Sequence, residues 1–149
     1  MPHEAPGQTS NDGQAVDTYM KLLDQSSLPF KARLADRLAV LTSAFAEDYD
    51  RGTLSPRAID ALVTFLASSA SFGYPELTAT PAGDLYAEWR GSDGRILTIE
   101  FLDSGDVHYL FFGPNPKHPQ RTDRLTGFTT ADALPDTVVR LAHLSGLAA

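Results

Sequence analysis

Residues 84–112, DLYAEWRGSDGRILTIEFLDSGDVHYLFF, decide the fold. Segments of this stretch alternate apolar and polar residues or run apolar, and they are rich in aromatic and β-branched side chains, as strands are. The segments are 84–90, 95–102 and 106–112, joined by Ser92-Asp93-Gly94 and Asp103-Ser104-Gly105. This spacing predicts an antiparallel meander.

The two connections fix which residues of the meander face each other. Each carries glycine at its third position, which suits a three-residue hairpin loop whose last residue is left-handed. That loop length collects uncharged residues on one face, whereas a four-residue loop would mix Glu100 into the set. The predicted core face consists of Leu85, Ala87, Trp89, Leu97, Ile99, Phe101, Val107, Tyr109 and Phe111. We expect helices at 55–71 and 132–145 to cover it.

The opposite face of the meander mixes charged with large apolar side chains. Its rows are Tyr86–Glu100–His108, Glu88–Thr98–Leu110 and Arg90–Ile96–Phe112. A solvated face would hold fewer apolar residues, and a buried face would hold no unpaired charge. Something therefore covers part of this face, either an N-terminal pair of helices or a bound ligand or partner.

Flanking patterns complete an α+β fold. Apolar residues recur with the helical period in four segments, at 14–25, 29–49, 55–71 and 132–145. The third segment begins with Ser55-Pro56, a pair typical of a helix N-terminus. Strands at 76–80 and 121–128 extend the meander to four or five strands between residues 76 and 128, with the last helix packed on the sheet. Residues 1–12 are polar, and we expect a disordered tail before a single domain at 13–149.

The composition excludes several classes of function. The chain has 149 residues, a formal net charge of −7 and no cysteine. The missing cysteines remove disulfides, thiolate metal sites and cysteine nucleophiles. The acidic balance disfavours direct binding to nucleic acid or to an anionic membrane. The N-terminus has no secretory pattern and no apolar run suits a bilayer, so we expect a cytoplasmic protein.

One row is the strongest candidate for catalysis. Tyr86, Glu100 and His108 lie within cross-strand reach in the predicted register, and a carboxylate beside an imidazole suits a general acid or base. Adjacent strands also pair such groups for structural reasons. The chain holds no metalloprotease helix motif, nucleophile elbow or glycine-rich phosphate loop, and its four histidines are dispersed. We therefore expect no enzyme, no cofactor and no metal site.

A basic, proline-rich loop follows the acidic meander. Residues 113–124, GPNPKHPQRTDR, hold three basic residues and His118 against one acid, whereas residues 76–106 hold seven acids against two arginines. Three prolines stiffen the loop, which lowers the entropy lost on binding. The loop is either a docking element for a carboxylate, a phosphate or an acidic surface, or a solvated crossover.

The run from Pro75 to Thr126 resembles a loosely defined group of small uncharacterised bacterial α+β proteins. They share a P-x-L-x-x-T-P-x-G-x-x-x-x-x-W hairpin followed by a glycine-turned strand pair. The matching residues here are Pro75, Leu77, Thr80, Pro81, Gly83 and Trp89. The resemblance implies a scaffold and a setting among bacterial accessory or defence-related genes, and it transfers no activity and no catalytic residue.

These observations favour a non-catalytic, cytoplasmic protein-interaction module of the antitoxin, immunity or inhibitor kind, including phage-type inhibitors of bacterial defence. We expect a protein partner, with a basic or nucleic-acid-binding one favoured by the acidic charge. The expected binding residues are Tyr86, Glu88, Arg90, Glu100, His108, Phe112, Lys117, His118, Arg121 and Arg124. An unpaired strand at 121–128 would also leave an edge for a homodimer.

Two other functions stay open. The first is a small-ligand binder with a pocket between sheet and helices, near Tyr86, Trp89, His108 and Phe112. The second is a small hydrolase-like enzyme that uses Glu100 and His108.

Overall fold

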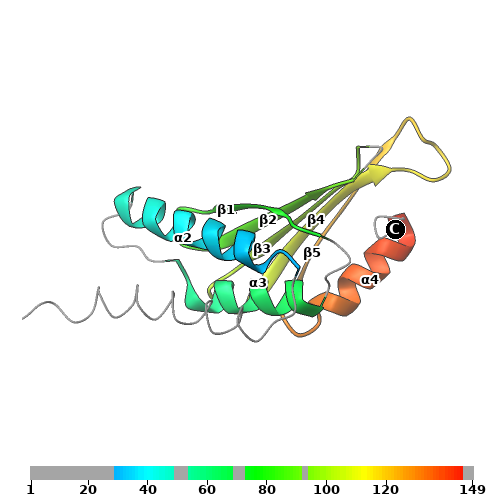
Figure 1. The fold of residues 1–149 in the computed structure, drawn as a ribbon. Helices are drawn as coiled ribbons and strands as arrows, with labels where there is room; N and C mark the ends of the chain where they lie inside the picture. The colour runs from blue at the N-terminus through cyan, green and yellow to red at the C-terminus, as the bar shows by residue number, and fades with distance from the viewer. Residues whose placement is uncertain (1–28, 49–53, 69–72, 92–93, 146–149) are drawn as a thin grey trace, which may run out of the picture.

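The computed structural model describes residues 29–48, 54–68, 73–91 and 94–145. Its elements are α2 (Lys31–Asp48), α3 (Pro56–Ser68), β1 (Glu76–Ala79), β2 (Leu85–Arg90), β3 (Ile96–Phe101), β4 (Asp106–Pro114), β5 (Thr122–Thr130) and α4 (Leu134–Ser145). They form the expected α+β fold, in which two helices precede an antiparallel sheet and one helix follows it (Figure 1). The expected tail and the helix at 14–25 lie outside these residues. None of the helices in the described ranges is both long enough and apolar enough to cross a membrane.

The sheet is a meander of five strands in the order β1-β2-β3-β4-β5. The predicted register of its central strands is confirmed. Trp89 faces Leu97 across β2 and β3, and Leu97 faces Phe111 across β3 and β4. The glycines that close the two central turns have φ angles of +77° at Gly94 and +91° at Gly105. Three-residue loops ending in a left-handed glycine therefore set the pairing.

The inner face of the sheet carries the apolar core. All nine predicted core-face residues lie on it, and eight are buried, while Tyr109 is half-buried against the core. α3 packs against β2 and β3, and α4 packs against β4 and β5 (Figure 1). The ring of Phe65 on α3 contacts those of Trp89 and Phe101, with centroid distances of 5.9 and 6.2 Å. The helices expected to cover this face do cover it.

Ser55 ties the start of α3 to two turns of the sheet. Its hydroxyl accepts a hydrogen bond from the backbone N–H of Ala58 at 3.1 Å, which is the predicted N-cap. The same hydroxyl donates to the carboxylate of Asp103 at 2.6 Å, in the turn between β3 and β4. The backbone N–H of Ser55 donates to the carbonyl of Gly83 at 2.8 Å, in the turn between β1 and β2. One residue therefore fixes the helix against the sheet, through its side chain and its backbone.

α2 lies along the edge of the sheet at β1 (Figure 1). Its predicted apolar stripe is buried at Leu34, Leu38, Leu41 and Phe45. The guanidinium of Arg37 donates two hydrogen bonds, of 3.1 and 2.7 Å, to the carbonyl of Leu77. The register points this carbonyl away from β2, so Arg37 occupies the free edge of β1.

This position of α2 corrects one of the two explanations for the mixed sheet face. The N-terminal helical pair was one of two candidates to cover that face, but α2, the member of the pair that the structure describes, packs against β1. The helix also begins at Lys31 rather than 29, and residue 49, predicted as its end, lies outside the described ranges. The other member of the pair, at 14–25, lies outside the part of the chain that the structure describes.

The hairpin of β4 and β5 is longer than expected. The basic loop predicted at 113–124 is reduced to residues 115–121, because Gly113 and Pro114 belong to β4 and 122–124 belong to β5. Asn115 donates its N–H to the carbonyl of Arg121 at 2.8 Å, so the next pair, Pro114 and Thr122, falls at a non-hydrogen-bonded position. Proline needs no N–H there, and the strand continues through it.

Two boundaries near the C-terminus also differ from the prediction. β5 runs to Thr130, whereas the expected strand ended at 128, and α4 begins at Leu134 rather than 132. The hydroxyl of Thr130 accepts a hydrogen bond from the N–H of Ala133 at 3.2 Å and closes the turn between them. α3 spans Pro56–Ser68, and the remaining residues predicted for it, 69–71, lie outside the described ranges.

We predict that Ser55→Ala lowers the free energy of unfolding by about 2 kcal/mol, because the N-cap and a hydrogen bond to a carboxylate are lost together. Urea denaturation of the two proteins measures the difference. Ser43→Ala is the matched control, since Ser43 is exposed on α2, and its effect should stay within about 0.5 kcal/mol. Equal effects of the two substitutions would show that Ser55 does not hold the helix to the sheet.

Candidate functional site

The outer face of the sheet is the face opposite the core. Its rows are Thr78–Tyr86–Glu100–His108–Phe128, Glu76–Glu88–Thr98–Leu110–Thr126 and Arg90–Ile96–Phe112–Arg124. The described helices pack on the inner face or beside β1, so none of them is placed across these rows. Half of these side chains are half-buried by their neighbours, Thr98 is buried, and the rest are exposed, among them Phe128 at 71%.

Seven of the ten residues predicted for binding lie on this outer face, and the other three lie in the loop between β4 and β5. The seven are Tyr86, Glu88, Arg90, Glu100, His108, Phe112 and Arg124. The three are Lys117, His118 and Arg121, all of them exposed. Two pairs, Gly113–Asp123 and Pro114–Thr122, separate the row of Phe112 and Arg124 from this loop.

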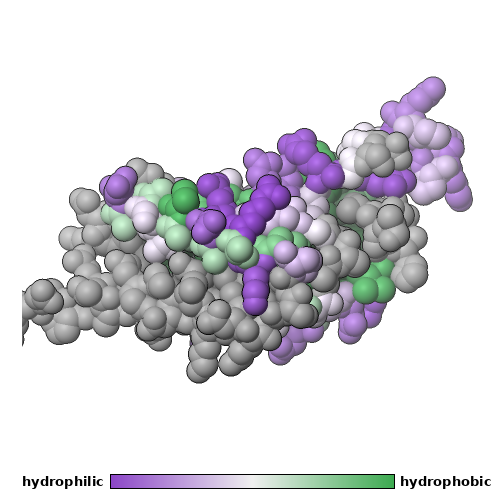
Figure 2. Space-filling model, in the orientation of Figure 1, coloured by the Kyte–Doolittle hydropathy of each residue, from purple (hydrophilic) through white to green (hydrophobic). Residues whose placement is uncertain are grey.

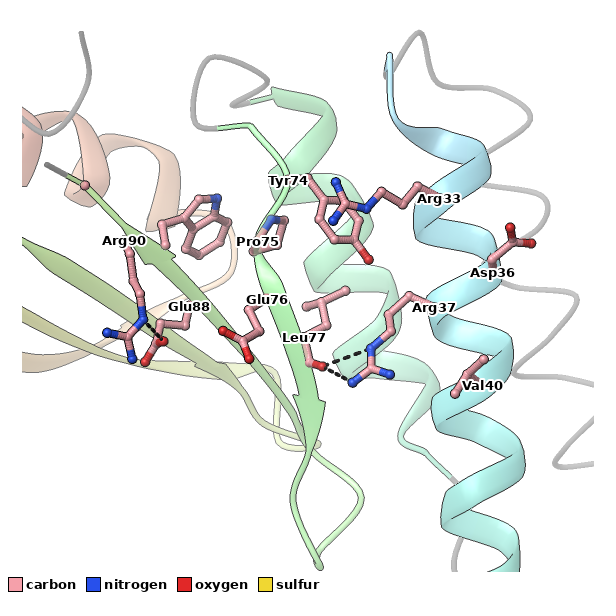
Figure 3. Close-up of a pocket in the computed structure, with 12 residues that line it drawn as sticks. Arg33, Asp36, Arg37, Val40, Tyr74, Pro75, Glu76, Leu77, Glu88 and Arg90 are labelled. Carbon is pink, nitrogen blue, oxygen red and sulfur yellow. Dashed lines mark hydrogen bonds and ion pairs between the residues drawn. The ribbon is translucent and has the colours of Figure 1, made fainter.

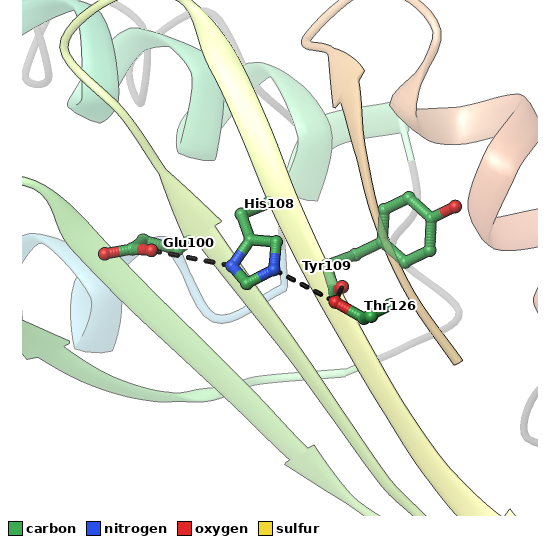
Figure 4. A network of polar contacts seen from close by, with 4 residues as sticks. All are labelled: Glu100, His108, Tyr109 and Thr126. Carbon is green, nitrogen blue, oxygen red and sulfur yellow. Dashed lines mark hydrogen bonds and ion pairs between the residues drawn. The ribbon is translucent and has the colours of Figure 1, made fainter. Parts of the chain in front are cut away.

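His108 is the centre of a polar row on the outer face (Figure 4). Its Nδ1 lies 3.8 Å from a carboxylate oxygen of Glu100, and its Nε2 lies 3.0 Å from the hydroxyl of Thr126. The aromatic ring of Phe128 stacks on the imidazole, with centroids 4.5 Å apart and planes inclined by 22°. A carboxylate, an imidazole and an aromatic ring are thus held side by side on three strands.

The hydrogen bonds of this row differ from those of a nucleophile with its base. The hydroxyl of Thr126 donates to the backbone carbonyl of Tyr109 at 3.2 Å, so it accepts the hydrogen on Nε2 of His108. A general base would need that nitrogen without its hydrogen. The distance from Nδ1 to Glu100 is also beyond a hydrogen bond. The arrangement therefore holds the imidazole in place without activating the threonine.

Charge is unevenly spread over the outer face. Glu76, Glu88 and Glu100 lie on β1, β2 and β3, and Arg124 lies on β5. Arg90 is paired with Glu88 at 2.9 Å, and its side chain is largely exposed. The acidic side of the face is therefore at β1–β3 and the basic side is at the β4–β5 hairpin.

The loop at the end of this hairpin is ordered by Asn115. Its side-chain oxygen accepts hydrogen bonds from the N–H groups of Lys117 and His118, at 2.8 and 3.1 Å, and its amide donates to Asp123 at 3.3 Å. The loop projects beyond the other strands and is hydrophilic (Figures 1 and 2). Local hydrogen bonds thus order the backbone that carries the basic side chains at the tip of the hairpin.

An open groove of about 800 Å³ lies between α2 and the first two strands (Figure 3). Charged residues from both sides line it, namely Arg33, Asp36 and Arg37 from α2 and Glu76, Glu88 and Arg90 from the strands. This groove does not coincide with the pocket predicted near Tyr86, Trp89, His108 and Phe112, because only Trp89 of these four residues lines it.

Tyr74 is one of the residues that line the groove. The guanidinium carbon of Arg33 lies 4.0 Å from the centre of its ring, and Phe30 meets the ring edge-on at a centroid distance of 5.5 Å. Burial raises the pKa of the Tyr74 phenol above its ordinary 10.0, and the positive charges of Arg33 and Arg37 oppose this rise without cancelling it. The phenol is therefore kept in its neutral form.

The sequence prediction missed the groove and four residues of the outer face, Glu76 and Thr78 on β1 and Thr126 and Phe128 on β5. The sequence did hold a signal for the groove: Arg33 and Arg37 are four positions apart on α2 and therefore share one side of the helix. Phe128 and Thr126 were not assigned to the face, because the length of the last hairpin loop did not fix the register of β5.

No family model matches the chain, and neither a curated protein nor a solved structure matches it. The resemblance to bacterial proteins with the same hairpin stays a prediction. Its residues serve the fold here, since the hydroxyl of Thr80 accepts from the N–H of Asp84 at 3.2 Å and the indole of Trp89 donates to the carbonyl of Gly73 at 3.2 Å. In the described part of the chain, no cluster of three or more His, Cys, Asp or Glu side chains is arranged to hold a metal ion.

The raised pKa of Tyr74 predicts a loss of stability at alkaline pH. The unfolded chain releases the phenol proton near pH 10.0, while the folded chain retains it to higher pH. The stabilisation is therefore complete below that pH and falls as the pH rises above it. Near neutrality, the free energies of unfolding of Tyr74→Phe and the wild type should change with pH in the same way, and above pH 10.0 the wild type should lose more stability. A constant difference between the two proteins at every pH would contradict the burial of this phenol.

Proposed function

We propose that the protein is a non-catalytic protein-binding module that holds its partner on the outer face of the sheet. The observation that supports this most is the composition of that face. Aromatic and aliphatic side chains, among them Phe112, Leu110 and the 71%-exposed Phe128, run through it between charged groups. Protein interfaces combine such an apolar centre with a polar rim.

The charges favour a partner with the opposite distribution. A basic surface fits over Glu76, Glu88 and Glu100, and an acidic surface fits beside the basic tip of the hairpin. Complementary potentials of this kind speed the encounter and fix the orientation of the two proteins. A nucleic-acid-binding protein presents a basic surface of the kind that these carboxylates favour.

The narrower function follows from this charge pattern. An acidic protein that occupies a basic, nucleic-acid-binding surface acts as an antitoxin, an immunity protein or an inhibitor, including inhibitors of bacterial defence. The proposal keeps the cytoplasmic setting expected from the sequence.

The groove beside α2 supports a second candidate function, a small-ligand binder, because Arg33, Arg37 and carboxylates line it. A ligand that raises the melting temperature of the wild type, but not that of Arg33→Gln, would identify this function.

The double variant Tyr86→Thr/Glu100→Lys tests the main proposal. It removes an aromatic ring and reverses a charge at the centre of the outer face, while both positions keep residues that tolerate a strand. Capture from the native host with the wild type, followed by titration of the purified partner, should show binding that the double variant weakens about a hundredfold. If the partner is a toxin or nuclease, the wild type should also suppress its activity and the variant should not.

Asp60→Lys is the matched control, since it makes the same charge reversal at an exposed position of α3, the helix that packs on the inner face of the sheet. It should bind the partner as the wild type does. The proposal is wrong if every captured protein is retained equally by the outer-face variant, or if the control loses binding to the same extent.

A further inference from the structure

The two edges of the sheet are treated differently. β1 has four residues, and Arg37 of α2 bonds to its free edge. β5 has nine residues with neither lysine nor proline, and among the described strands it pairs only with β4. Short strands, lysines, prolines and covering helices are the usual means of blocking an edge. Among the elements that the structure describes, the edge of β5 is therefore open to another strand.

The register identifies the backbone groups at this open edge. Asn115 and Arg121 face each other as a hydrogen-bonded pair, and such pairs alternate along β4 and β5. Asp123, Leu125, Gly127 and Thr129 therefore bond to β4. The residues whose N–H and C=O groups point away from the sheet are Thr122, Arg124, Thr126, Phe128 and Thr130.

Exposed apolar side chains gather beside this edge. The large apolar residues that are exposed in the described ranges are Val40, Leu125, Phe128 and Val139. Three of these four belong to β5 or to α4, which packs against it. Unpaired backbone and exposed apolar side chains thus occur at the same place, which is typical of an interface.

We propose that a second copy of the chain occupies this edge, with the two β5 strands antiparallel and a two-fold axis at Thr126. A two-fold axis there makes Thr126 face its own copy, Arg124 face Phe128 of the other copy, and Thr122 face Thr130 of the other copy. These are all residues with free edge groups, so each pair exchanges hydrogen bonds. The edge of β5 is thus complementary to itself, and this identifies a second copy of the chain as its occupant.

The side chains fit the same register on both faces. On the outer face the guanidinium of Arg124 meets the exposed ring of Phe128 from the other copy, a cation–π pair that occurs twice. On the inner face Leu125 lies opposite Gly127 of the other copy. A Cβ at Gly127 would lie 2.5 Å from the Tyr109 hydroxyl, so this ring already lies over the glycine and offers Leu125 an apolar surface.

Pairing of this kind joins the two sheets into one. Because residues of one face pair with residues of the same face, the two outer faces become continuous and α4 of each copy lies on the opposite side. The proposal does not depend on the protein-binding function, and the purified chain alone tests it.

Sedimentation velocity of the full chain over a concentration series measures the dimer. The wild type should dimerise, and Phe128→Lys should weaken the dimer about tenfold because it places a lysine opposite Arg124 twice. Phe128→Glu is the matched variant, since it loses the same ring but places a carboxylate opposite Arg124, and it should retain the dimer. The exchange Phe128→Lys/Arg124→Glu should restore it.

Circular dichroism confirms that each variant is folded. A monomer at every concentration would overturn the proposal. Equal effects of Phe128→Lys and Phe128→Glu, or no recovery in the exchanged pair, would also overturn it, because a dimer formed elsewhere does not sense which charge faces Arg124.

Discussion

The structure depends on turns of fixed length. Gly83, Gly94 and Gly105 adopt φ angles of +88°, +77° and +91°, which a side chain would oppose, and each ends a loop of three residues. This length places every charged residue of β2 and β3 on the outer face and leaves the inner face apolar. A slip of one residue would bring Glu100 towards α3, at the cost of a buried charge.

The arrangement of the helices follows from this division. The inner face is buried by α3 and α4, and Ser55 anchors α3 to two of the turns. α2 then buries its apolar stripe against the core and blocks the edge at β1 through Arg37. What stays available among the described elements is the outer face and the edge of β5, and these are the surfaces to which we assign the partner and the second copy.

The sequence predicts the parts of this structure that local rules control. Alternation and turn glycines gave the register of β2–β4, and Ser55-Pro56 gave the start of α3. Contacts between residues that are distant in the sequence were not predictable. Arg37 and Leu77 are forty positions apart, and no local pattern indicates that the guanidinium of one bonds to the carbonyl of the other. The last hairpin was also missed in part, since prolines in a sequence suggest a loop while Pro114 occupies a strand position that needs no N–H. The place of Phe128 against His108 depended on that register.

Residue-resolved amide hydrogen exchange along β5 tests the account most directly, because it reads the register and the open edge together. The N–H groups of Leu125, Gly127 and Thr129 should be protected at every protein concentration, since they bond to β4. Those of Arg124, Thr126 and Phe128 should exchange rapidly in dilute protein and become protected as the concentration rises. In dilute protein, uniform protection along the strand or the opposite alternation would contradict the register of the outer face. Rapid exchange of Arg124, Thr126 and Phe128 at every concentration would contradict the pairing of the edge.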